Sequence, residues 1–81
     1  MSALDYVILR NVERKMDKED LEPAKVDVLV CDGHVTFTGH LVYRINHHPM
    51  TEQELYKFKR EILRIPGVSE ITFHFLHDTL V

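Results

Sequence analysis

Two segments in which apolar and polar residues alternate lie on either side of the dipeptide Asp32-Gly33. Alternation with a period of two is typical of a β-strand that buries one face. Asp-Gly is favoured in two-residue type I′ hairpin turns, because both central residues need a positive φ. The pattern therefore predicts an antiparallel hairpin over 26–41 in which Cys31 pairs with His34.

This register separates the hairpin side chains onto two faces, because directly paired residues share a face. The first face is apolar and is expected in the core; it carries Val26, Val28, Val30, Val35, Phe37 and Leu41. The second face is mixed and is expected to contact water; it carries Asp27, Leu29, Cys31, His34, Thr36, Thr38 and His40. Gly39 falls on the core face, which indicates a bulge or a close backbone approach by a helix.

Apolar residues at helical spacing predict one helix before the hairpin and one after it. The first extends from Ala3 to Met16 or Lys18, and its predicted buried stripe is Leu4, Val7, Ile8, Val12 and Met16. The second covers about 52–64 and is expected to bury Leu55, Phe58, Ile62 and Ile65, with Tyr56 and Leu63 at its flanks. Capping boxes are predicted at the start of both helices, from Ser2 with Asp5 and from Thr51 with Glu54.

The remaining segments complete an α-β-β-α-β order. The acidic connector at 17–25 is predicted to be a solvated loop in which Leu21 is buried and Pro23 stops any helix. The alternative is a site for a cation or a basic partner. Pro66-Gly67 ends the second helix, and alternation over 68–76 predicts a third strand that can pair in parallel with the second. We expect an α+β fold: a two-layer sandwich with a three-stranded mixed sheet and both helices on one face.

The length of 81 residues fits a single domain over 1–81, with a core at about 4–76 and a short tail at 77–81. The net charge of −3 argues against a nucleic-acid-binding protein. The single cysteine excludes an internal disulfide, and no apolar run approaches the length of about 20 residues that spans a membrane. Without a signal-peptide pattern the expected location is the cytoplasm, or the periplasm if a signal has been removed.

The hairpin, the second helix and the segment IPGVSEITFHF together resemble the BON domain family. The resemblance covers about 4–75, and the matching motif residues are Gly33, Val35, Phe37, Gly39, Gly67 and Val68. Two features depart from the family pattern: Phe37 replaces a leucine, and the loop over 43–50 is longer. The resemblance implies a binding module associated with phospholipid or the cell envelope. The family has no catalytic motif or cofactor to carry over, so no enzyme is expected.

Three basic residues of the second helix, Lys57, Arg60 and Arg64, form a stripe that could meet anionic lipid headgroups. The alternative is a solvated face on which Glu61 pairs with Lys57 and with Arg64.

The second face of the sheet is the other candidate surface, since no helix is left to cover it. A contact there with another protein domain, or with a second copy in a homodimer, would use Leu29, Cys31, His34, His40, His74 and Leu76. Strand edges could serve the same purpose by strand addition. The six histidines match no established ligand spacing, so no metal is expected. Cys31 and His34 face one another but lack an orienting third group.

Overall fold

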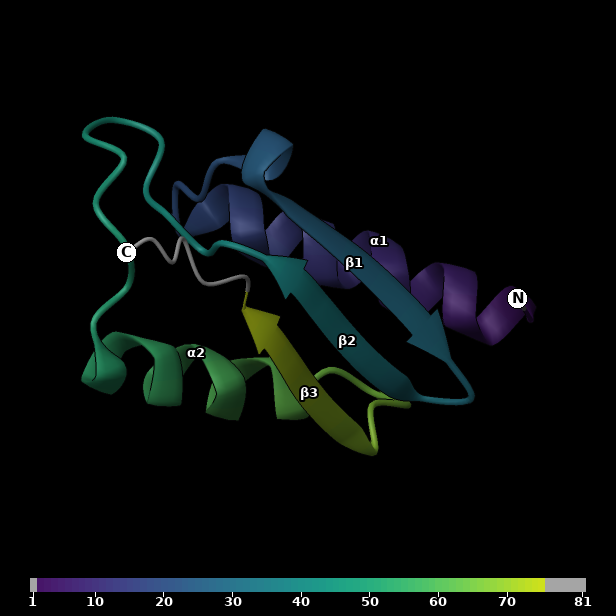
Figure 1. Ribbon diagram of the computed structural model, residues 1–81. Helices are drawn as coiled ribbons and strands as arrows, with labels where there is room; N and C mark the ends of the chain where they lie inside the picture. Colours follow the sequence, from purple (N-terminus) through teal and green to yellow (C-terminus); the bar gives the residue numbers. More distant parts are fainter. Residues whose placement is uncertain (1, 76–81) are drawn as a thin grey trace.

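The computed structural model describes residues 2–75 and shows the expected two-layer α+β sandwich (Figure 1). Its elements are α1 (Ala3–Lys18), the 3₁₀ helix η1 (Pro23–Lys25), β1 (Val26–Cys31), β2 (His34–Gly39), α2 (Glu52–Leu63) and β3 (Glu70–Phe75). The strand order is β1-β2-β3, with β1 antiparallel to β2 and β2 parallel to β3. Both helices pack on one face of this mixed sheet, α1 against β1 and α2 against β3.

The core lies between the helices and the predicted apolar face of the hairpin. The register of β1 and β2 is the predicted one, from the Cys31–His34 pair at the turn to the last pair of the ladder. Phe37 is fully buried at the centre of the sheet, and its ring meets Phe58 of α2 edge-on, with 5.6 Å between ring centroids. It also stacks on Phe73 of β3 at 5.3 Å. These rings join the two layers, because each packs against a neighbour from another element.

Helix α1 presents a different stripe to the core from the predicted one. The buried positions are Asp5, Ile8, Val12 and Met16, one helical turn apart. Leu4 and Val7 are more than half exposed, so the prediction that they are buried was wrong. The acidic side chain occupies the inward position at the start of the helix, and this rotates both apolar neighbours outward.

The Asp5 carboxylate binds the hairpin turn. Its oxygens accept hydrogen bonds from the backbone N–H groups of Asp32 (3.0 Å) and Gly33 (3.2 Å), and only 3% of the residue is exposed. The N–H of Asp32, more than that of Gly33, lowers the pKa of Asp5 below its ordinary value, although burial opposes the shift. Ser2 accepts from Asp5 N–H at 3.1 Å and caps the helix as predicted, but the carboxylate serves the turn rather than the predicted capping box.

Glycine is required at two positions, because another part of the backbone lies too close there to leave room for a Cβ. Gly33 has φ +82°, and a Cβ at this position would lie 2.5 Å from the carbonyl oxygen of Gly67. Gly39 has φ +118°, and a Cβ there would overlap the carbonyl oxygen of Lys25. The close backbone approach predicted at Gly39 is therefore present, and it comes from the last residue of η1.

The second helix follows the prediction closely. Thr51 and Glu54 form the complete capping box, with bonds of 3.1 and 2.9 Å, and Arg64 is the C-cap. Phe58 and Ile62 are buried, whereas the other two expected core residues, Leu55 and Ile65, are partly buried against the core.

The acidic connector contains a feature that the sequence reading missed. Helix α1 ends at Lys18, with Glu19 as its C-cap, so Pro23 is not the residue that stops it. Pro23 instead begins η1, a position that suits a residue without an N–H. Leu21 is buried as predicted. The third strand begins at Glu70 rather than at residue 68, and Leu76 and the tail at 77–81 lie outside the described residues.

Replacing Asp5 with Asn tests the bond between α1 and the turn. Asn keeps the shape but removes the charge and one acceptor, so at pH 7 the melting temperature should fall by several degrees. The pKa of Asp5 in the folded state is lower than its ordinary value of 3.8, so the charged carboxylate stabilises the fold fully above pH 3.8. This stabilisation is lost as the pH falls through the folded-state pKa. The difference between wild type and variant should therefore shrink in acid.

Thermal unfolding followed by circular dichroism from pH 7 to pH 2 measures this difference. The control is Asp27→Asn, which makes the same change at an exposed position. A loss in Asp5→Asn no greater than in Asp27→Asn would contradict a stabilising role for the bond.

Candidate functional site

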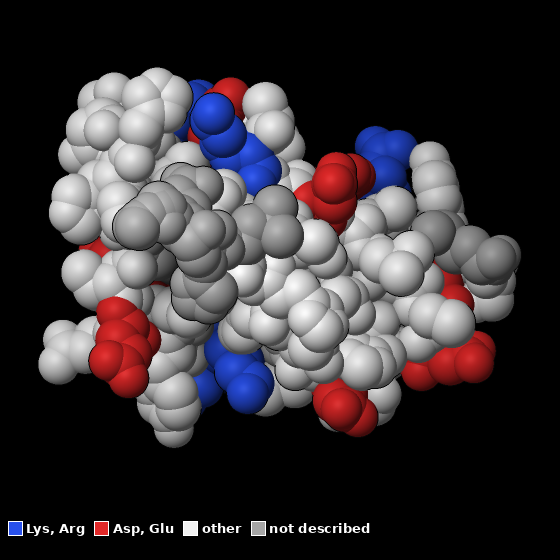
Figure 2. Space-filling model, in the orientation of Figure 1, with Lys and Arg blue, Asp and Glu red and all other residues white. Residues whose placement is uncertain are grey.

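Basic side chains are concentrated on the helical layer. Eight of the ten lysines and arginines lie on α1, on α2 or at the α2 C-cap: Arg10, Arg14, Lys15, Lys18, Lys57, Lys59, Arg60 and Arg64. The opposite side of the molecule, the uncovered sheet face turned toward the viewer in Figure 2, shows a broad uncharged area with charged side chains mostly near its margins. The same two helices carry six acidic residues, so eight cations less six carboxylates leave a positive excess of two in a chain whose net charge is −3.

The predicted lipid-binding residues come together in the structure. Lys57, Arg60 and Arg64 are exposed on the outer side of α2 and, with Glu61, line a shallow hollow of about 250 Å³. Within residues 2–75, no carboxylate lies within 4.0 Å of a nitrogen of these three cations. Their charges thus remain available to an anionic ligand.

The carboxylate of Glu61 is turned to a different partner from those expected. It pairs with Lys15 of α1 at 2.8 Å, so the predicted pairing with Lys57 and Arg64 was wrong. The bond to Lys15 lowers the pKa of Glu61, and the more distant charges of Lys57 and Arg64 add to this effect. Because one negative charge is neutralised by the neighbouring helix, the stripe on α2 retains more positive potential than its own sequence indicates.

Two exposed apolar side chains accompany the stripe. Tyr56 is 66% exposed and Leu63 is 42% exposed, and both lie on the outer side of α2. The guanidinium of Arg60 is 6.0 Å from the centre of the Tyr56 ring, within the range of a cation–π contact. The outer side of α2 therefore combines cations with an aromatic and an aliphatic group, as interfacial helices do.

The uncovered face of the sheet holds the second set of predicted residues. Leu29 is 60% exposed and Cys31 is exposed on β1, while His34 and His40 are half-buried and His74 is exposed. Within residues 2–75, no helix packs on this face. The sixth predicted residue, Leu76, lies outside the described part of the chain.

The polar groups on this face form local contacts. A ring nitrogen of His34, Nε2, is hydrogen-bonded to Oγ1 of Thr72 on β3 at 2.6 Å. Over the described range 2–75, no three histidine, cysteine, aspartate or glutamate side chains are grouped so that they could hold a metal ion.

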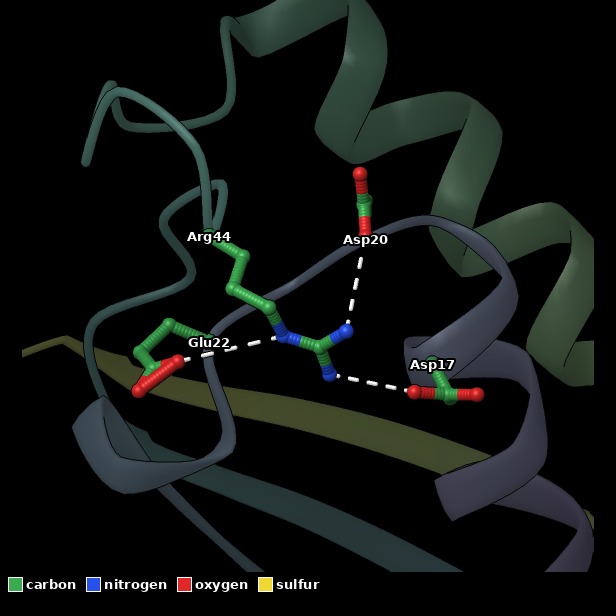
Figure 3. Close-up of polar contacts among 4 residues, drawn as sticks. All are labelled: Asp17, Asp20, Glu22 and Arg44. Carbon is green, nitrogen blue, oxygen red and sulfur yellow. Dashed lines mark hydrogen bonds and ion pairs between the residues drawn. The ribbon is translucent and has the colours of Figure 1, made fainter.

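Backbone hydrogen bonds from Arg44 N–H to Asp20 and from Glu22 N–H to Val42 join the loop between β2 and α2 to the acidic connector. The side chain of Arg44, which the sequence analysis did not single out, adds ion pairs to this junction. The guanidinium of Arg44 contacts Asp17 at 3.1 Å, Asp20 at 3.4 Å and Glu22 at 4.0 Å (Figure 3). These carboxylates come from the end of α1 and from the acidic connector, so part of the connector serves as an anchor for the loop. The exposed His47, with φ +56°, follows in this anchored segment.

None of the described helices is both long enough and apolar enough to cross a bilayer.

The sequence analysis did not identify Lys15 as the partner of Glu61, because the two residues are far apart in the chain and no local pattern connects them. The exposure of Tyr56 and Leu63 could be expected from the sequence, because the helical period places both residues beside the buried stripe of the second helix and not in it.

Comparison with family models, with curated proteins and with solved structures finds no match to this chain.

Proposed function

We propose that this domain is a non-enzymatic binding module that associates with anionic phospholipid through the outer side of α2. The observation that carries the proposal is the gathering of Lys57, Arg60 and Arg64 next to the exposed Tyr56 and Leu63, while Glu61 is held by the other helix. The cations would meet lipid phosphates, and the two apolar groups would enter the interfacial region.

The expected affinity is modest. Each basic residue close to an anionic surface contributes about 1 kcal/mol, so three contribute about 3 kcal/mol. Partial insertion of Leu63 and Tyr56 adds on the order of 1–2 kcal/mol, since full burial of a large apolar side chain is worth about 1.5–3 kcal/mol. A total near 5 kcal/mol corresponds to a dissociation constant on the order of 0.1–1 mM for one domain. The association would be reversible and would respond to lipid charge and to salt.

The resemblance to the BON family supports the same proposal, because similar domains are associated with phospholipid and with the bacterial envelope. In this chain the motif glycines are structural: Gly33 and Gly39 allow close backbone contacts. The motif residues therefore belong to the scaffold, and the contact with lipid is proposed for the basic residues of α2.

The uncovered sheet face supports a second candidate function, a contact with another protein or with a second copy of the chain. Two observations favour it: Leu29 is exposed on this face, and the face shows a broad uncharged area in Figure 2. Charged residues are depleted at the centres of protein interfaces, and this face shares that property.

Flotation with liposomes tests the lipid proposal. Binding should appear with anionic phosphatidylserine or phosphatidylglycerol vesicles, be weak with pure phosphatidylcholine, and fall as the salt concentration rises. Arg60→Gln should weaken binding about fivefold, the equivalent of about 1 kcal/mol. The triple change of Lys57, Arg60 and Arg64 to Gln should abolish it.

The matched control is Lys25→Gln, which removes one positive charge from η1 and should change binding less than about twofold. Equal losses in Arg60→Gln and Lys25→Gln would show that net charge, rather than the α2 surface, decides binding. Binding that is insensitive to salt and unchanged in the triple variant would exclude the proposal.

Sedimentation of the full chain tests self-association through the sheet face. A concentration-dependent dimer that dissociates in Leu29→Lys would support this second candidate, because the new charge would lie inside the contact. A monomer at millimolar concentration would exclude the homodimer.

A further inference from the structure

A groove runs between α1 and the free edge of β1, away from the lipid-binding side of α2. It has a volume of about 450 Å³. It is lined by the apolar residues Leu9, Met16 and Val28 and by the acidic residues Glu13 and Asp27, among others. A hollow bordered by a helix on one side and an edge strand on the other is the setting in which extended peptides bind by strand addition.

The edge of β1 offers unpaired backbone groups. In the described residues β1 is hydrogen-bonded to β2 on one side and has no strand on the other. Cys31 and His34 flank the two-residue turn and form a hydrogen-bonded pair, so the alternation of an antiparallel ladder directs the N–H and C=O groups of Val28 and Val30 to the free edge. Open edges of this kind are templates for a further strand.

The charges around the groove favour a basic occupant. In the described part of the chain, Glu13 and Asp27 have no ion-pair partner within 4.0 Å. Arg10, one turn from Glu13, donates to the hydroxyl of Tyr6 instead. At the end of the groove the single cation of Arg44 is shared among three carboxylates (Figure 3).

We propose that the β1 edge and the adjoining groove bind an extended segment of a partner protein in which apolar residues alternate with lysine or arginine. Added as a strand beside β1, such a segment would direct every second side chain toward α1, onto Leu9 and Val28. The intervening side chains would lie on the uncovered face, beside Asp27. The alternation of the ligand thus follows from the two different surfaces on either side of the edge.

This inference does not depend on the lipid proposal. The cations of α2 and the carboxylates of the β1 edge belong to different elements and attract opposite charges. One of the two activities can therefore fail while the other remains.

Amide chemical shifts of the full ¹⁵N-labelled chain, titrated with the acetylated and amidated peptide Lys-Val-Lys-Val-Lys, test the inference. Saturable shifts should appear at Val28 and Val30 and on the Leu9–Glu13 side of α1, with a dissociation constant on the order of 0.1–1 mM for so short a peptide. The charge-reversed peptide Glu-Val-Glu-Val-Glu should bind at least about tenfold more weakly. A peptide that is N-methylated at its three central residues should also lose affinity, because it lacks the backbone donors that face β1 in either strand direction.

Asp27→Asn should weaken binding about threefold to fivefold, as expected for one exposed ion pair. The matched control, Glu70→Gln at the start of β3, should leave binding unchanged. Equal binding of both charge forms of the peptide, undiminished binding to Asp27→Asn, or shifts confined to α2 would each overturn the inference. Concentration-dependent shifts of Val28 and Val30 without peptide would identify a second copy as the occupant and would also overturn it.

Discussion

The turn at Asp32-Gly33 is the contact on which the rest of the fold depends. Two separate segments meet its backbone. The Asp5 carboxylate of α1 accepts from both turn N–H groups. In the connection from α2 to β3, the Ser69 N–H donates to the carbonyl of Gly33 at 2.9 Å, and the Gly67 carbonyl occupies the space that a Cβ on Gly33 would need. The start of α1, the hairpin and the connection from α2 to β3 are therefore held at one end of the molecule. Gly33 is needed there both for its positive φ and for the space that a side chain would fill.

This junction brings both helices to the same face of the sheet and leaves the other face uncovered. Three surfaces with different chemistry result: a basic and partly apolar outer side of α2, a largely uncharged sheet face, and an acidic groove along the β1 edge. The ion pair between Lys15 and Glu61 contributes to this division, because it removes a carboxylate from the basic surface. The proposed lipid surface and the proposed peptide groove therefore lie on different parts of the molecule.

Local patterns predicted the parts of the fold that local chemistry determines. The Asp32-Gly33 turn gave the register of the hairpin, and the capping box of Thr51 and Glu54 gave the start of α2 to the residue. The error at Leu4 and Val7 had a distant cause, since Asp5 faces inward to reach a turn 27 residues away. The candidate site was predictable to the same extent: the helical spacing of Lys57, Arg60 and Arg64 predicted the basic stripe on α2. Its electrostatic partner Lys15, and the anchoring role of Arg44, depend on contacts between distant segments.

The central claim, that the outer side of α2 faces the membrane, is tested most directly by line broadening from a spin-labelled lipid in anionic bicelles. Amide signals of Tyr56, Arg60 and Leu63 should broaden most, because these residues lie at the proposed interface. Signals of Leu29 and Thr36, on the opposite side of the molecule, should remain sharp. Broadening that is strongest at Leu29 and Thr36 would contradict the account, because it would place the uncovered sheet face, and not the helices, on the lipid.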